Sequence, residues 1–172
     1  MKKFLLVFLC VCFSFLTFGC ETETQLRVAT ISNMTSKLST HYSIRVNLEK
    51  DDRVAERYVD LQIKSSKENQ TLRFGEENAD AYTITLEDKD YWYNLTYLIS
   101  KTNGLEVEGE YQKYEDFGSK IFNFSSQNDV EISFRVVAGK EKENPETGEK
   151  ILVLSEDISD VLTIKVKKLD DE

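Results

Sequence analysis

Apolar and polar residues alternate along most of the chain after residue 40. Every second residue is apolar in five segments: Tyr42–Leu48, Val59–Ile63, Tyr82–Leu86, Val130–Val136 and Leu162–Val166. Such alternation is typical of β-strands with one buried and one solvated face. The segments are rich in Val, Ile, Thr, Tyr and Phe, and helical spacing is nowhere sustained. The pattern therefore predicts an all-β protein.

The breaks between these segments carry turn-forming residues. Asn144–Gly148 has the sequence NPETG, with Pro where φ near −65° is needed and Gly where a positive φ is expected. We expect a tight hairpin that joins Val136–Lys142 to Lys150–Leu154, and a second turn at Asn103-Gly104. About nine or ten strands with short polar connections indicate an antiparallel β-sandwich, immunoglobulin-like or fibronectin-like.

The segment Asp90–Ile99 is the most aromatic part of the chain, and we interpret it as a strand. Alternate residues from Tyr91 to Ile99, including Tyr93, would lie on one face, and Trp92 would lie on the other. Two interpretations stay open. Tyr91, Trp92 and Tyr93 form an exposed ligand-binding surface, or Trp92 is a core residue while the tyrosines cover the outer surface.

The N-terminus has the features of an export signal. Two lysines follow Met1, and residues 4–18 are almost entirely apolar before the chain turns charged at Glu21. This run is shorter than the roughly 20 apolar residues that a membrane-spanning helix needs, so cleavage is the better interpretation. We expect residues 1–19 to be a signal peptide.

The end of this segment, residues 16–20 with the sequence LTFGC, resembles the lipobox of bacterial lipoproteins. The resemblance implies that Cys20 is acylated and becomes the mature N-terminus, anchored to a bacterial membrane on the periplasmic side or at the cell surface. Thr17 and Gly19 also fit ordinary signal cleavage, which would release a soluble protein. The expected organisation is a lipidated Cys20 with a tether to residue 25, a β-sandwich domain at 26–168 and an acidic tail at 169–172.

Cysteine usage and charge are consistent with this organisation. Cys10 and Cys12 lie inside the removed segment, so the mature chain keeps one thiol, at Cys20, and forms no internal disulfide. Without Lys2 and Lys3, the mature chain has 20 basic and 31 acidic residues, a formal charge of −11. This charge argues against nucleic acid as a partner and against direct adsorption on anionic lipids. We therefore expect the protein to attach to the membrane through its lipid alone.

No motif for catalysis, a metal or a cofactor stands out. Acidic pairs such as Asp51-Asp52 and Glu76-Glu77 fall in expected loops but match no spaced calcium-binding loop. His41 is the only histidine, and we interpret it as a surface or edge residue. We therefore expect no metal, no cofactor and no enzymatic activity.

Two function classes remain. The first is a binding or adhesive module of the cell envelope that presents a surface to a protein or glycan ligand. The second is a structural accessory subunit of an envelope complex. An enzyme is a distant third, because nucleophile, base and metal ligands do not converge in the sequence.

Overall fold

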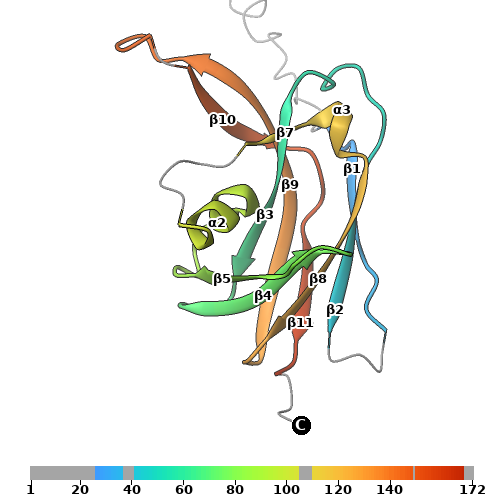
Figure 1. Ribbon diagram of the computed structural model, residues 1–172. Coiled ribbons are helices and arrows are strands. Elements are labelled where there is room, and N and C mark those ends of the chain that lie inside the picture. Colours follow the sequence, from blue (N-terminus) through green and yellow to red (C-terminus); the bar gives the residue numbers. More distant parts are fainter. Residues whose placement is uncertain (1–25, 37–40, 105–109, 149, 169–172) are drawn as a thin grey trace, which may run out of the picture.

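The computed structural model describes residues 26–36, 41–104, 110–148 and 150–168 (Figure 1). The predicted signal peptide, Cys20 and the acidic tail therefore lie outside the described residues. The described elements are β1 (Ala29–Asn33), β2 (Tyr42–Leu48), β3 (Tyr58–Ser65), β4 (Gln70–Glu76), β5 (Tyr82–Leu86), β6 (Tyr93–Asn94), α2 (Leu95–Thr102), β7 (Gln112–Lys113), α3 (Tyr114–Phe117), β8 (Ser119–Ser126), β9 (Val130–Glu143), β10 (Lys150–Asp157) and β11 (Leu162–Val166).

The strands form two antiparallel sheets. The first has the order β1-β2-β8-β4-β5. The second has the order β10-β9-β3-β6, with β11 also paired to β9 and β7 to β3. The prediction of an all-β chain is confirmed at this level, and all five segments that were predicted from alternation are strands.

The apolar faces of the two sheets meet in one core. From the first sheet, Phe74 and Phe124 point inward, with ring centroids 6.0 Å apart. Phe134 of β9 meets both rings, at 6.4 Å and 5.1 Å respectively. The largest fully buried side chains come from both sheets and include Ile44, Leu61 and Ile132. Burial of these alternating residues is the main force that holds the sheets together.

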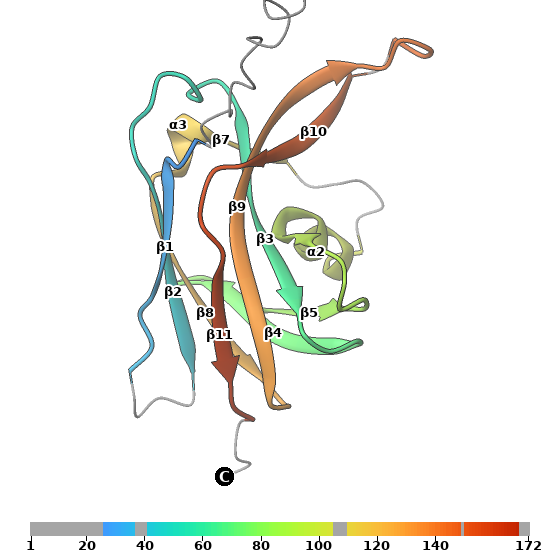
Figure 2. The ribbon, with the colours of Figure 1, turned by 180° about the vertical axis from the view of Figure 1, so that it is seen from behind.

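The predicted hairpin is confirmed. β9 and β10 pair from Lys150↔Glu143 to Asp157↔Val137, and the turn is closed by a 2.8 Å hydrogen bond from the Gly148 amide to the Asn144 carbonyl. Gly148 has φ +69°, the left-handed region in which glycine carries no steric penalty. Figures 1 and 2 both show this hairpin extending beyond the two sheets, at the end where β1 begins. We call residues 140–148 and 150–153 the arm.

The central strands of the second sheet depart from the predicted alternation. In β3, the residues from Val59 to Ile63 are all buried, although only every second one is apolar. Asp60 and Gln62 face away from the core and are covered there by other segments. The expected wet face is therefore absent from the middle of β3, where polar side chains are buried and need hydrogen-bond partners.

The predicted strand at Asp90–Ile99 is wrong. Only Tyr93 and Asn94 pair with β3, and the chain then turns into α2. This segment has two hydrophobic patterns at once. Its alternating aromatic residues indicate a strand, but Leu95, Leu98 and Ile99 also have the i, i+3, i+4 spacing of one helix face. The predicted turn at Asn103-Gly104 is present, and it ends this helix.

Candidate functional site

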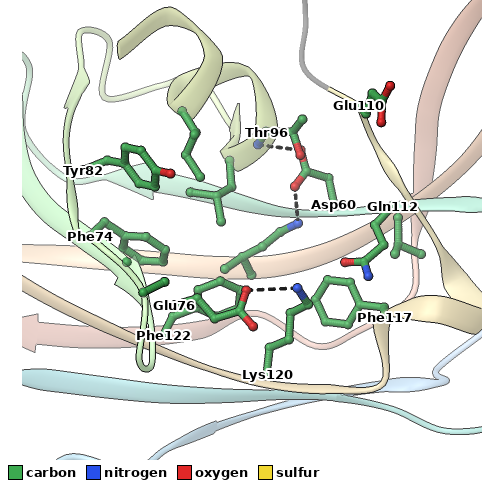
Figure 3. Close-up of a pocket in the computed structure, with 16 residues that line it drawn as sticks. Asp60, Phe74, Glu76, Tyr82, Thr96, Glu110, Gln112, Phe117, Lys120 and Phe122 are labelled. Atoms are coloured by element: carbon green, nitrogen blue, oxygen red, sulfur yellow. Dashed lines mark hydrogen bonds and ion pairs between the residues drawn. The ribbon is translucent and has the colours of Figure 1, made fainter. Parts of the chain in front are cut away.

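A pocket of about 250 Å³ opens beside α2, where the helix meets both sheets (Figure 3). α2 contacts β3 of one sheet and β5 of the other, so the helix bridges the two sheets. We call this cavity the α2 pocket. It is lined by Val59, Asp60, Leu61, Phe74, Gly75, Glu76, Ala79, Tyr82, Leu95, Thr96, Ile99, Glu110, Gln112, Phe117, Lys120 and Phe122.

Apolar side chains from three directions form much of the wall. Phe74 and Phe122 come from the neighbouring strands β4 and β8, with ring centroids 5.5 Å apart. Leu95 and Ile99 lie one helical turn apart on α2 and face the same space. Tyr82 adds a half-buried aromatic ring from β5 (Figure 3). These groups can surround an apolar ligand body.

Asp60 is the most buried carboxylate of the lining, with 4% of its surface exposed. One carboxylate oxygen accepts a hydrogen bond from the Leu61 amide at 2.8 Å, and the other accepts one from the Thr96 amide at 3.1 Å. Thr96 is the second residue of α2, and the residue that precedes the helix, Asn94, provides no side-chain cap. Asp60 therefore caps the helix from a neighbouring strand and fixes α2 against β3.

The side of the pocket opposite Asp60 carries an ion pair (Figure 3). Lys120 of β8 lies 3.0 Å from the carboxylate of Glu76 at the end of β4, and its ammonium is 5.3 Å from the centre of the Phe117 ring. The amide side chain of Gln112 donates a hydrogen bond to the Asp116 carbonyl at 2.9 Å. Glu110 contributes an exposed carboxylate on the side of Asp60 and Thr96, away from Lys120 (Figure 3).

The pocket thus combines an apolar wall with a few polar groups, which is the usual composition of small-molecule sites. Among the described residues that line it there is no serine, cysteine or histidine. The lining can hold a ligand by apolar contact, hydrogen bonds and charge, but offers none of these three side chains as a nucleophile.

The three aromatic residues that were predicted as a binding surface lie in different environments. Tyr91 is 60% exposed, and its ring meets the Tyr93 ring edge-on at 4.8 Å. Tyr93 is buried, and its hydroxyl accepts a hydrogen bond from the Asp88 amide at 2.8 Å. Trp92 is half-buried rather than a fully buried core residue, so the interpretation with Trp92 inside and the tyrosines outside is wrong. The binding role of the three residues stays a prediction, and none of them lines the α2 pocket.

Trp92 instead belongs to a polar layer on the outer face of the second sheet. The Arg135 guanidinium lies 4.5 Å from the centre of the Trp92 ring, a cation–π geometry. Arg135 also binds Asp157 at 3.0 Å and the Gln62 side chain at 2.8 Å. Gln62 then donates to Asn94 at 2.8 Å. The layer satisfies the buried Gln62 side chain of β3, and Arg135 covers one face of the Trp92 ring.

The acidic pairs do not assemble into a metal site within the described part of the chain, where no three His, Cys, Asp or Glu residues are grouped to hold an ion. Asp51 is held by Arg53, whose hydrogen bonds at 2.9 Å and 2.5 Å lower the pKa of Asp51 to about 2. Glu76 lies at the end of a strand rather than in a loop. His41 is exposed directly before β2, as predicted.

No protein-family model matches the chain, and no curated protein shows significant similarity to it. Among the residues that the structure describes, no helix is both long enough and apolar enough to cross a membrane.

Little in the sequence indicates the α2 pocket. Asp60 stands between two apolar residues and fits the polar side of an alternating strand, and Glu76 fits an acidic turn. Their place in one lining depends on contacts between β3, β4 and α2, which are distant in the chain. A detectable signal was the helical spacing of Leu95, Leu98 and Ile99, which would have placed a helix beside the sheets.

Proposed function

We propose that this protein is a binding module of the bacterial cell envelope, held at a membrane by acyl chains on Cys20, and that it binds its ligand in the α2 pocket. The observation that carries the binding role is the pocket itself. Small-molecule sites are concave and mostly apolar, with a few polar groups that orient the ligand. A pocket of about 250 Å³ with walls from both sheets and α2, an apolar lining and several carboxylates has this composition.

The proposed anchor rests on the N-terminal sequence. The lipobox-like residues 16–20 precede a short proposed tether, and the described residues start at Leu26, three residues before β1. Because the mature chain has a formal charge of −11, the protein surface itself would be repelled by anionic headgroups, so stable attachment requires the lipid.

The binding role is tested by a ligand-observed NMR screen of a small-molecule library against the described domain in its mature form. We expect binders that the Ile99→Trp variant no longer retains, because the larger side chain fills the pocket from α2. Tyr97→Trp is the matched control, since Tyr97 lies on the same helix, is exposed and does not line the pocket. Compounds that bind both variants as tightly as the wild type, or a complete lack of binders, would contradict the proposal.

The anchor is tested by mass spectrometry of the N-terminal peptide from the protein as its native cells produce it. Acyl chains on Cys20 would support the lipoprotein assignment. An unmodified thiol at this residue in a freely diffusing protein, or an uncut leader, would overturn it.

A second candidate function, an accessory subunit of an envelope complex, is favoured by the arm. Within the described residues, β10 pairs with β9 alone, so its other edge is open, and Ile151 is 46% exposed. Open strand edges with apolar side chains are docking elements for other chains. A stoichiometric partner that is captured from the native envelope by the wild type and by Val161→Lys, but not by Ile151→Lys, would favour this role. Val161 is a matched exposed residue outside the arm.

The finer fold class is part of the proposal. Two antiparallel sheets with a common core support an immunoglobulin-like or fibronectin-like β-sandwich, since the chain crosses between the sheets from β2 to β3, from β3 to β4 and from β8 to β9. An experimental structure of the mature protein, compared strand by strand with both classes, tests the assignment.

A further inference from the structure

We infer that the α2 pocket selects a primary amine carried on an apolar stem, an inference that rests on the binding function proposed above. The first argument is charge. Among the described residues that line the pocket there are three carboxylates, those of Asp60, Glu76 and Glu110, and one ammonium, that of Lys120. Lys120 pairs with Glu76, so Asp60 and Glu110 supply two negative charges in excess. A cleft with low-dielectric walls and one prevailing sign of charge concentrates the opposite charge.

The single cation is already engaged. The Lys120 ammonium lies 3.0 Å from Glu76 and above the Phe117 ring, and 21% of its side chain is exposed. An anionic ligand would have to compete with Glu76 for Lys120 and would meet Asp60 and Glu110 as well. The lining is therefore unfavourable for carboxylates and phosphates.

The second argument is the separation of the carboxylates. No group of three acidic, histidine or cysteine residues among those described could hold a metal ion. A divalent ion needs several oxygen ligands within about 2.6 Å. An ammonium needs only one close carboxylate, and the remaining charge acts at a distance.

The third argument is the wall. Phe74, Phe122, Leu95 and Ile99 enclose space that a fully hydrated small cation would leave without contact. A stem of aromatic or aliphatic carbons fills this space and removes apolar surface from water, and aromatic ring faces also attract an ammonium. A ligand that joins an apolar stem to an amine matches both the apolar wall and the negative charge of the lining.

The test uses three probes with the same phenylethyl stem: phenethylamine, the uncharged 2-phenylethanol and the anionic 3-phenylpropanoate. Each is titrated into the mature protein at low ionic strength and followed by NMR. We expect phenethylamine to bind at least about tenfold more tightly than the alcohol, and the acid to bind more weakly than both. The preference for the amine should shrink as salt is added, because salt screens exposed charges.

Charge variants then locate the effect. Glu110→Gln and Glu76→Gln should each reduce the preference for phenethylamine over 2-phenylethanol several-fold. Glu77→Gln removes the same charge from the neighbouring exposed residue, which does not line the pocket, and should leave the preference nearly unchanged. Equal losses in all three variants would indicate a general effect of net charge and would overturn the inference.

The outcomes separate the ligand class from the binding function. If the alcohol or the acid binds as tightly as the amine, and Ile99→Trp abolishes this binding, the amine preference is refuted while the pocket keeps its binding role. If no probe or library compound binds, both proposals fail. Nα-acetyl-lysine methylamide is a fourth probe, which mimics a lysine side chain in a peptide. If it binds more tightly than phenethylamine, the amine belongs to a lysine side chain; if it binds more weakly, the amine belongs to a free small molecule.

Discussion

Strand β9 passes through two environments, and the difference between them shows what holds this protein together. From Val130 to Ala138, β9 lies in the second sheet, and its inward side chains Ile132, Phe134 and Val136 are completely buried. From Lys140 to Glu143 it lies in the arm, and all four side chains are exposed.

Backbone pairing is antiparallel in both parts, since β10 accompanies β9 from Val137 to Glu143 with one shift of register between Leu154 and Glu156. The difference is the opposing sheet. We call the two sheets without the arm the body. In the body, Phe134 meets Phe74 and Phe124 across the core, whereas Ile151 in the arm is 46% exposed. Hydrogen bonds in the ladder contribute little net free energy, and burial contributes most. We therefore expect the stability of the fold to reside in the body.

The largest effect is expected for Phe134→Ala. The substitution removes a ring that contacts two others in the core and leaves a cavity, so the free energy of unfolding should fall by about 3–5 kcal/mol. Urea unfolding followed by circular dichroism measures the change. A loss below 1 kcal/mol would show that the core between the sheets is not the main source of stability.

Gly139 marks the boundary between body and arm, and Gly139→Ala should have the next largest effect. An added Cβ would lie 1.9 Å from the Val153 carbonyl oxygen, so β10 would have to move away from β9. We expect a loss of about 1–3 kcal/mol by thermal or urea unfolding. Lys140→Ala, one residue further into the arm, is the matched control and should change stability by less than about 0.5 kcal/mol.

Tyr114→Phe tests a polar contact in the body. The buried Tyr114 hydroxyl donates to the Glu49 carbonyl and lies 3.2 Å from the Val28 carbonyl, so its removal should cost about 1 kcal/mol. Burial raises the pKa of Tyr114 from 10.0 to about 12. The neutral hydroxyl is thus favoured in the folded state, and its stabilising contribution is constant below about pH 10 and lost between pH 10 and 12.

The measurement is the free energy of unfolding of both proteins across this pH range. The gap between wild type and Tyr114→Phe should narrow as the pH rises from 10 to 12. A gap that stays constant over the whole range would contradict the assigned cause.

The smallest effect is expected for Ile151→Ala in the arm, because this side chain is already largely in water. The free energy of unfolding should change by less than about 0.5 kcal/mol. In native-state hydrogen exchange, amides of the arm should be less protected than those of Ile132–Val136. A loss comparable to that of Phe134→Ala would mean that the arm packs against the body in solution.

Prediction from the sequence was accurate where local chemistry and burial agree. The five alternating segments became strands because each has an apolar face that the opposing sheet covers, and the NPETG turn formed because proline and glycine favour its backbone angles. Prediction failed at Tyr91–Ile99, where aromatic alternation and helical spacing coexist. There α2 forms with Asp60 of β3 as its cap, and no local pattern contains this long-range contact.

The sequence by itself determined the class of secondary structure, the main hairpin and the acidic character of the chain, since these depend on residues within a few positions of each other and on composition. The tertiary structure alone decided that Asp60 and Gln62 are buried, that Tyr93 rather than Trp92 is enclosed, and that carboxylates from separate segments line one pocket. The reason is physical. Whether a polar side chain contacts water, a helix end or a ligand depends on which distant segment packs over it. These segments come together only when the two sheets and α2 pack against each other.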